Sequence, residues 1–443
     1  MAPPTDTGFP GLDTAAVARA LALVGGDASG ELEVSFERRL ELELPPEGAV
    51  VGARLRREEG VAARLVDEER SWLASRDGLG GRELGEVLRQ VVRVGPPAAP
   101  EPRIEIGPSP VAPPRAAVEA FPGRLERALR RRFAAFPLRL TVRWQRRDLQ
   151  VVGARMVPPA EREELYSIDV ELPWGRCGAL AVRLGDAEAE ELATRLLARF
   201  RAREAPPPPA GRCAVVLAPA AAAVALHEAV AHALEADLLA RGGRPDAALG
   251  VELGSPLLDV LDDPSGAPEG VDRATDDEGM PVQRRWLLRG GRVDQPIADR
   301  TSARRWPALL PGSGFRSGRH GRIRPRTVHL ELLPGTASIE ELLGLAEGGW
   351  FVPEIGSGSL DPDSGRFTLE APFAHRVAGG APAEGCGRLR LSGRVPELLA
   401  AVVGIGAATE AGGAGWCAKG GERRAVWARV PAIAVAGLEV EPA

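Results

Sequence analysis

Two proline-rich stretches limit what this chain can fold into. Residues 95–114 contain eight prolines, and four consecutive prolines follow at Pro206–Pro209. Proline lacks the backbone N–H that the interior of a helix or a central strand requires, so neither stretch can lie within one. Such segments act as stiff, extended spacers between folded units. The sequence therefore predicts three units, at about residues 1–95, 112–204 and 212–443.

Hydrophobic periodicity within these units predicts an α+β fold. Apolar residues alternate with polar ones at Leu32, Val34 and Phe36, which is the pattern of a half-buried strand. In Arg82–Val92 the apolar residues fall on one face of a helix. Glycine-punctuated strand segments dominate the chain beyond Gly243. We expect N-terminal α/β units followed by a larger, strand-rich C-terminal domain.

Charge and hydropathy argue against several classes of partner. The formal net charge is −5, which disfavours a general polyanion binder. Nine arginines lie within residues 124–147, but no aromatic stacking series accompanies them, so a solvated surface is expected there and not a nucleic-acid site. The longest apolar run, Cys213–Leu226, is too short to span a bilayer. We expect a cytoplasmic protein without a secretory signal, a membrane contact or a disulfide framework.

One short motif in the alanine-rich segment after Pro219 carries chemistry. Two of the five histidines, His227 and His232, flank Glu228 in an HExxxH pattern. A chain of this composition would contain such a pattern by chance roughly 0.008 times, so accident is a weak explanation. Neutral imidazoles suit Zn²⁺. An adjacent carboxylate suits a general base that deprotonates a zinc-bound water and then protonates the leaving amine.

The spacing of this motif demands an irregular helix. Residues five apart lie about 140° apart around a regular α-helix, so His227 and His232 could not reach one ion from it. A π-turn within Glu228–His232 would bring both onto one face, and a helix break before His232 is the alternative. Zinc also needs a third protein ligand. The side-chain chemistry leaves several candidates open: Glu235, Asp237, His320, His329, His375 and the four cysteines.

The segment Ala225–Asp237 resembles the metal-binding helix of the TldD/PmbA family of zinc metallopeptidases. Further segments resemble this family across residues 212–443, whereas the N-terminal part is similar only in layout. These segments are Asp276–Gly279 with Pro281 and Gln283–Arg284, Leu333–Gly335, Gly356–Gly358 with Asp361–Pro362, Gly365–Phe367, and Gly415–Gly421. Three positions depart from the family pattern: Ala231 and Ala418 replace common glycines, and His329 stands where asparagine is expected.

The resemblance implies a set of roles for residues in this chain. His227, His232 and Cys417 would be the zinc ligands and Glu228 the catalytic base. Lys419, the only lysine, would favour the thiolate form of Cys417. The intact motif is typical of the catalytic, TldD-like side of the family. The resemblance further implies a homodimer or a heterodimer with a family paralogue, and a zinc site enclosed in a cavity.

The sequence thus predicts a zinc metallopeptidase that hydrolyses flexible or unfolded peptides. An extended substrate could bind by adding a strand to a sheet edge. Two alternatives stay open, a non-catalytic peptide- or metal-binding subunit of a dimer and a dedicated precursor-peptide maturation protease. Retention of Glu228 argues against the first. The remaining histidines and cysteines are assigned plainer roles: solvated surface for His320 and for His375 in a loop, and small buried or semi-buried groups for Cys177, Cys213 and Cys386.

Overall fold

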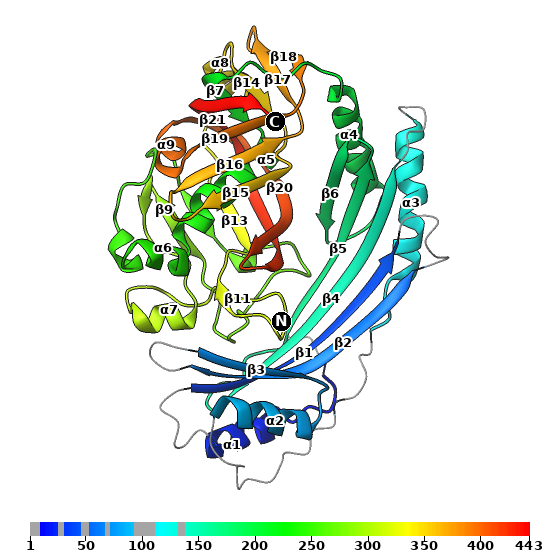
Figure 1. The fold of residues 1–443 in the computed structure, drawn as a ribbon, viewed down its shortest axis with the longest axis vertical. Helices are drawn as coiled ribbons and strands as arrows, with labels where there is room; N and C mark the ends of the chain where they lie inside the picture. The colour runs from blue at the N-terminus through cyan, green and yellow to red at the C-terminus, as the bar shows by residue number, and fades with distance from the viewer. Residues whose placement is uncertain are drawn as a thin grey trace.

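The computed structural model describes residues 9–24, 31–45, 53–66, 71–92, 106, 111–131 and 138–443. It contains a curved N-terminal sheet and a strand-rich C-terminal domain that lies against one face of that sheet (Figure 1). The predicted α+β class is confirmed. The proline-rich stretch at 95–114 lies mostly outside the described residues, and Pro206–Pro209 connects the two bodies. Among the residues described, no helix is both long and apolar enough to cross a membrane.

The N-terminal sheet is antiparallel and joins the segments on both sides of the first proline-rich stretch. Its order is β3-β2-β1-β4-β5-β6. Strand β1, from the predicted unit 1–95, pairs with β4, from the predicted unit 112–204, so both contribute to one sheet. The strands are β1 (Glu31–Leu44), β2 (Arg54–Val66), β3 (Ser71–Asp77), β4 (Arg139–Gly153), β5 (Glu161–Leu172) and β6 (Gly175–Ala181).

Two helix pairs cover this sheet at its two ends (Figure 1). Val34 and Phe36 of β1 pack with one pair, and Leu40 and Leu42 of the same strand pack with the other. These side chains share one face because successive strand residues point to opposite faces. The first pair is α1 (Thr14–Val24) and α2 (Gly81–Val92), and the second is α3 (Arg115–Arg130) and α4 (Asp186–Ala202).

The opposite face of β1 corrects the expectation of a half-buried strand. Its polar residues Glu33, Ser35 and Glu37 are buried as well. Arg300 and Arg316 of the C-terminal domain donate to Glu33 and Ser35, and Arg147 of the neighbouring strand β4 donates to Glu37. The covering groups are arginines and carboxylates, so a polar strand face is compatible with full burial.

The C-terminal domain is built on a mixed sheet around a long terminal hairpin. The main path is β10-β9-β8-β13-β21-β7-β14-β17-β18, with β15, β16, β19 and β20 attached. Its strands are β7 (Gly211–Leu217), β8 (Val260–Asp262), β9 (Arg285–Arg289), β10 (Arg292–Val293), β13 (His329–Leu332), β14 (Trp350–Val352), β15 (Ser357–Asp361), β16 (Arg366–Ala371), β17 (Ala374–Ala378), β18 (Ala381–Cys386), β19 (Leu389–Arg394), β20 (Val402–Lys419) and β21 (Glu422–Pro442).

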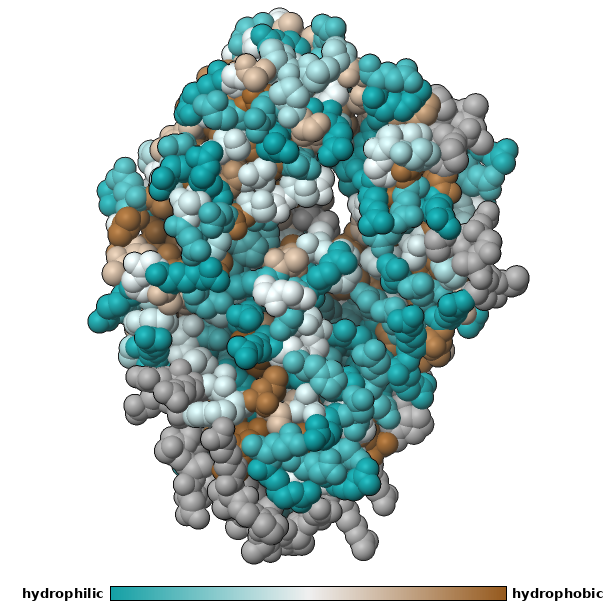
Figure 2. Space-filling view, in the orientation of Figure 1, coloured by the Kyte–Doolittle hydropathy of each residue, from teal (hydrophilic) through white to brown (hydrophobic). Residues whose placement is uncertain are grey.

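Short helices and one small ribbon complete this domain. The helices are α5 (Pro219–Leu226), α6 (Ala236–Gly242), α7 (Arg300–Arg305), α8 (Ile339–Leu345) and α9 (Val395–Ala400), and the ribbon pairs β11 (Gly314–Phe315) with β12 (Arg324–Pro325). The β20–β21 hairpin turns at Gly420 and Gly421, whose φ angles of +59° and +83° suit a tight two-residue turn. Figure 2 shows a largely hydrophilic surface that is hollowed between the C-terminal domain and the end of the sheet that carries α4.

Buried ion pairs join the two bodies. Arg147 of β4 donates to Glu37 of β1 at 3.0 Å and to Asp277 of the C-terminal domain at 3.0 Å. Arg64 of β2 pairs with Glu278. Burial by itself would raise the pKa of Asp277, but Arg147 and Arg273 outweigh burial and hold that pKa well below its usual range. The Asp276–Gly279 segment therefore anchors the N-terminal sheet on the C-terminal domain.

We expect Asp277→Asn to destabilise the protein by about 3–5 kcal/mol, because it leaves Arg147 and Arg273 buried without their shared counter-charge. Calorimetric unfolding of the purified variant measures this loss. Asp363→Asn is the matched control, since Asp363 is exposed and its carboxylate pairs at the surface with Arg241. An unfolding profile of Asp277→Asn that matches this control would contradict the assigned role.

Candidate metal centre

The helix that carries the HExxxH motif changes its winding within the motif. Helix α5 ends at Leu226, a π-helical turn spans His227–Ala231, and a 3₁₀ turn follows at His232–Leu234. The backbone N–H of His232 donates to the carbonyl of His227, five residues earlier. The two imidazole rings consequently lie on one side, with centroids 4.6 Å apart. The predicted π-turn is confirmed.

A third donor reaches these histidines from the other end of the chain. Cys417 of β20 places its Sγ 3.4 Å from His232 Nε2. One potential ligand atom from each of His227, His232 and Cys417 lies within 4.8 Å of the other two. Within the described part of the chain, the buried Nε2 atom of His227 has no hydrogen-bond partner. Two imidazoles and one thiol with an orphaned nitrogen fit a metal ion with one coordination position left open.

Electrostatics favour the ligating form of the cysteine. Burial alone would raise the pKa of the Cys417 thiol, but His227 and His232 outweigh burial and lower it to about 4. The thiolate is the form of cysteine that binds metals.

Glu235 lies behind His232. His232 Nδ1 donates to Glu235 Oε2 at 2.8 Å, which leaves Nε2 facing Cys417. Burial opposes ionisation of Glu235, yet the charges of His232 and Lys419 lower its pKa to about 2. A carboxylate that accepts from a ligand histidine fixes the tautomer and the orientation of the ring. The sequence left Glu235 open as a third metal ligand. In the structure it instead holds the ring of His232, a candidate ligand, in position.

Lys419 occupies a different place from the one expected. Its ammonium group lies 2.9 Å from Glu235 and 2.6 Å from Asp237, and it also donates to the Pro325 carbonyl. The cation that contacts the sulfur is Arg326, whose Nη2 lies 3.2 Å from Cys417 Sγ and 2.8 Å from the Cys417 carbonyl. Sequence reasoning did not single out Arg326, because it is 91 residues from Cys417 and only the tertiary fold brings the two together.

Glu228 is buried beside strand β15. A Cβ atom at Gly358 would lie 2.8 Å from Glu228 Cγ and 3.1 Å from its Oε1. Only glycine at position 358 therefore leaves room for this carboxylate where it stands. The carboxylate of Glu228 makes no hydrogen bond to any residue that the structure describes, so both of its oxygens are available as hydrogen-bond acceptors.

The structure does not bring the other candidates into this cluster. His320 is exposed and contacts Ser75, which matches the expected surface role. His375 is half-buried in β17 and packs edge-to-face against Phe373, so the expected loop position is wrong. His329 is buried in β13, where its ring contacts the Asp263 carbonyl. Cys177 and Cys386 are buried, and Cys213 is half-buried.

The fold and this donor set define a class of protein, a two-body α+β chain with a candidate His₂Cys centre. Residues 210–442 match the family model described as the PmbA/TldA metallopeptidase C-terminal domain. The chain belongs to the PmbA/TldD family. The expected family membership is confirmed.

Curated relatives carry metalloprotease names. The chain is 31% identical over 233 residues to a metalloprotease of Methanothermobacter thermautotrophicus, covering 52% of this chain and 49% of the relative. It is 28% identical over 238 residues to a metalloprotease TldD homolog of Haemophilus influenzae, covering 52% and 48%. A zinc metalloprotease TldD homolog of Saccharolobus solfataricus is 28% identical over 242 residues, covering 53% and 52%. The chain spans about half the length of these curated relatives.

Solved structures share the whole fold at low sequence identity. TldE from Thermococcus kodakarensis superposes with a TM-score of 0.73 at 19% identity, covering 96% of this chain and 100% of that one. A putative modulator of a DNA gyrase from Thermotoga maritima gives a TM-score of 0.72 at 19% identity, covering 97% and 99%. These likenesses establish the fold of both bodies.

Proposed function

We propose that this chain is a zinc-dependent peptidase that hydrolyses flexible or unfolded peptides. The observation that supports it most is the π-turn, which turns His227 and His232 to one side where Cys417 can join them. The metalloprotease names of the relatives agree with a hydrolase of this kind. A zinc ion held by these three residues would supply a Lewis acid that polarises the scissile carbonyl.

In this proposal Glu228 performs the proton transfers. Its carboxylate accepts a proton from the attacking water and then donates that proton to the leaving amine. The side chain suits the role because it follows His227 directly and has no competing hydrogen bond from the described residues. Burial beside β15 restricts its motion, so the carboxylate is held in place before the substrate arrives.

The neighbourhood of Glu228 also suits an extended substrate. Among the described strands, β15 pairs only with β16, so its other edge has free backbone groups. Gly358, the residue packed against Glu228, belongs to this edge strand. A peptide that adds to the edge of β15 would be recognised through its backbone, which requires an unfolded chain.

We further propose that the protein acts in the cytoplasm as a homodimer or as a heterodimer with a family paralogue. The fold shared with TldE agrees with a partner that is a family paralogue of the same fold. Light scattering of the purified chain, alone and mixed with its paralogue, tests this proposal. A chain that stays monomeric in both samples would contradict it.

Purified protein should contain about one zinc per chain, and Cys417→Ala should lose most of it, because two imidazoles form an incomplete ligand set. Elemental analysis after dialysis measures the content. Cys213→Ala is the control, since Cys213 is also a free thiol but lies outside the cluster. Full zinc occupancy in Cys417→Ala would remove this cysteine from the site.

Glu228→Gln should reduce hydrolysis of a mixed library of unstructured peptides about 10²–10⁴-fold while zinc stays bound, because amide cannot accept the proton. Product formation is followed by mass spectrometry beside zinc content. Near-normal activity of this variant would refute the general-base role. A zinc-loaded native protein that cleaves no peptide would favour the non-catalytic alternative.

Gly358→Ala should reduce turnover about 10²-fold. The new Cβ would lie too close to Glu228 Cγ, so the carboxylate would be pushed out of the position that proton transfer requires. Gly356→Ala is the matched control from the same segment, since its Cβ meets the nearest atom, Glu370 O, at an ordinary 3.5 Å. Zinc content should be unchanged in both variants. Equal turnover of the two variants would show that Glu228 does not depend on this contact.

A further inference from the structure

Arg326 is a buried arginine that forms no ion pair with a carboxylate of the described residues. Its side chain is 1% exposed. The guanidinium donates to the Glu422 main-chain carbonyl at 3.5 Å and to Cys417, and its Nε has no hydrogen-bond partner among the residues described. A buried cation is costly unless nearby groups compensate for the water it has lost. Cys417 is the residue that supplies the closest such groups.

One nitrogen of Arg326 contacts Cys417 at two places. Nη2 lies 2.8 Å from the Cys417 carbonyl oxygen and 3.2 Å from its Sγ. Holding the main chain and the side chain of one residue together fixes the direction in which its sulfur points. With Cys417 as a thiolate, the sulfur also carries the negative charge that Arg326 otherwise lacks, and a hydrogen bond between two charged groups is stronger than one between neutral groups.

The position of Arg326 is itself fixed by its neighbours. Its backbone N–H donates to the Ser313 carbonyl at 3.0 Å. Pro325, the preceding residue, ends strand β12, and its carbonyl accepts a hydrogen bond from Lys419 at 2.8 Å. Lys419 belongs to the same strand as Cys417. The backbone of Arg326 is therefore held against the hairpin independently of the sulfur, so the guanidinium can orient Cys417.

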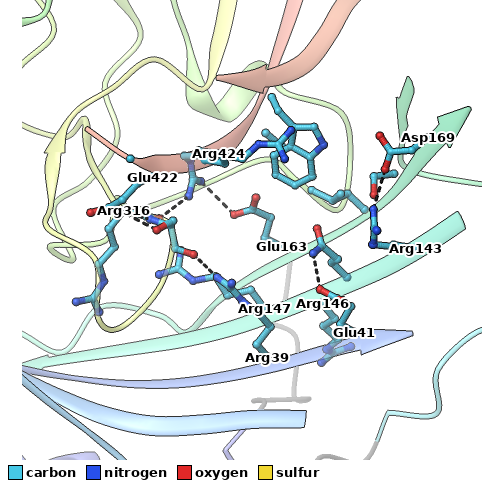
Figure 3. Close-up of a pocket in the computed structure, with 18 residues that line it drawn as sticks. Arg39, Glu41, Arg143, Arg146, Arg147, Glu163, Asp169, Arg316, Glu422 and Arg424 are labelled. Carbon is cyan, nitrogen blue, oxygen red and sulfur yellow. Dashed lines mark hydrogen bonds and ion pairs between the residues drawn. The ribbon is translucent and has the colours of Figure 1, made fainter. Parts of the chain in front are cut away.

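The arginine closest to Cys417 in the hairpin ladder does not share this role. Arg424 lies directly opposite Cys417 in β21. Figure 3 shows its guanidinium paired with Glu163 of β5, on the side of the hairpin where the cavity to the N-terminal sheet lies, and this pair measures 3.1 Å. Among the arginines that the structure describes, Arg326 is the one that donates to Cys417 Sγ.

We propose that Arg326 is a positioning residue of the candidate metal centre, which directs the Cys417 sulfur and offsets the negative charge of the thiolate. This inference rests on the proposed zinc-dependent function. A thiolate ligand donates electron density to a metal ion and so weakens the Lewis acid that polarises a substrate carbonyl. A guanidinium that bonds to the same sulfur withdraws part of that density, since hydrogen bonds around a cysteine ligand tune the properties of the bound metal.

Cobalt(II) in place of zinc makes the bond between cysteine and metal visible through its charge-transfer absorption. Arg326→Met removes the charge and the donors but keeps a long side chain. We expect it to bind Co²⁺ about 10–100-fold more weakly in competition with a chelator, which is the usual effect of losing a group that supports a ligand. The absorption band of the remaining complex should move to longer wavelength, because a sulfur without this hydrogen bond gives up an electron more readily.

Two further variants make the comparison specific. Arg326→Lys keeps a positive charge and N–H donors, so its Co²⁺ affinity and its band position should lie between those of the native protein and Arg326→Met. Arg285→Met is the matched control, because Arg285 is also a buried arginine that donates to main-chain carbonyls, those of Leu310 and Pro311. This control should keep the native affinity and the native band.

Thermal unfolding of the metal-free chain separates the contact with sulfur from the contact with the main chain. Cys417→Ala removes the sulfur and leaves the carbonyl in place. Arg326→Met should therefore lower the unfolding midpoint less in the Cys417→Ala background than in the native background, because the arginine has already lost its anionic partner. Arg326→Lys is measured in the same two backgrounds and supplies the comparison if Arg326→Met does not fold.

Three results would overturn the role of Arg326: native Co²⁺ affinity and band position in Arg326→Met, equal losses of unfolding midpoint in both backgrounds, or no cobalt–thiolate band in the native protein. The proposed peptidase function fails in a different way. If the variants behave as expected but the zinc-loaded native protein cleaves no peptide, the role of Arg326 stands and the peptidase proposal falls. If the native protein cleaves peptides and Arg326→Met binds Co²⁺ as the native protein does, only the role of Arg326 falls.

Discussion

The backbone hydrogen bond from His232 to the His227 carbonyl is the constraint on which the candidate centre depends. A regular helix would separate these histidines by about 140°, and the single π-turn removes that separation. The fold accommodates this irregular turn because the residues of α5 and of the π-turn itself are packed in the same apolar core. It also sends the chain into the extended residue Glu235, whose carboxylate then lies behind His232. One change of winding thereby places both a candidate ligand and its supporting carboxylate.

The β20–β21 hairpin provides the second half of this arrangement. It brings Cys417 to the two histidines and Lys419 to Glu235. Arg326 contacts the hairpin at both the sulfur and the carbonyl of Cys417.

Buried arginine–carboxylate pairs join the two bodies beside a small apolar cluster, in which Leu165 of β5 packs with Trp427 of β21. Arg147, Asp277 and Glu37 are all buried, and their mutual pairing compensates for the loss of water. Buried ion pairs of this kind add little net stability, but they penalise any other alignment of the two bodies, since a misplaced partner would leave a charge unpaired.

Local patterns in the sequence determined the α+β class, the strand at Leu32–Phe36 and the need for a π-turn at His227–His232. These features follow from the 3.6-residue period of a helix and the two-residue period of a strand, and both periods can be read from residues close together in the sequence. The family segments of residues 212–443 named Cys417 by resemblance, whereas side-chain chemistry alone left nine donors equivalent. Only the tertiary structure decided that Glu235 stands behind His232, that Arg326 and not Lys419 contacts the sulfur, and that the polar face of β1 is buried. The contacts of Arg326 and of β1 join segments 91 to 281 residues apart, and local periodicity carries no information about which distant side chains meet. Glu235 is only three residues from His232, but their contact depends on the irregular winding of the chain between them.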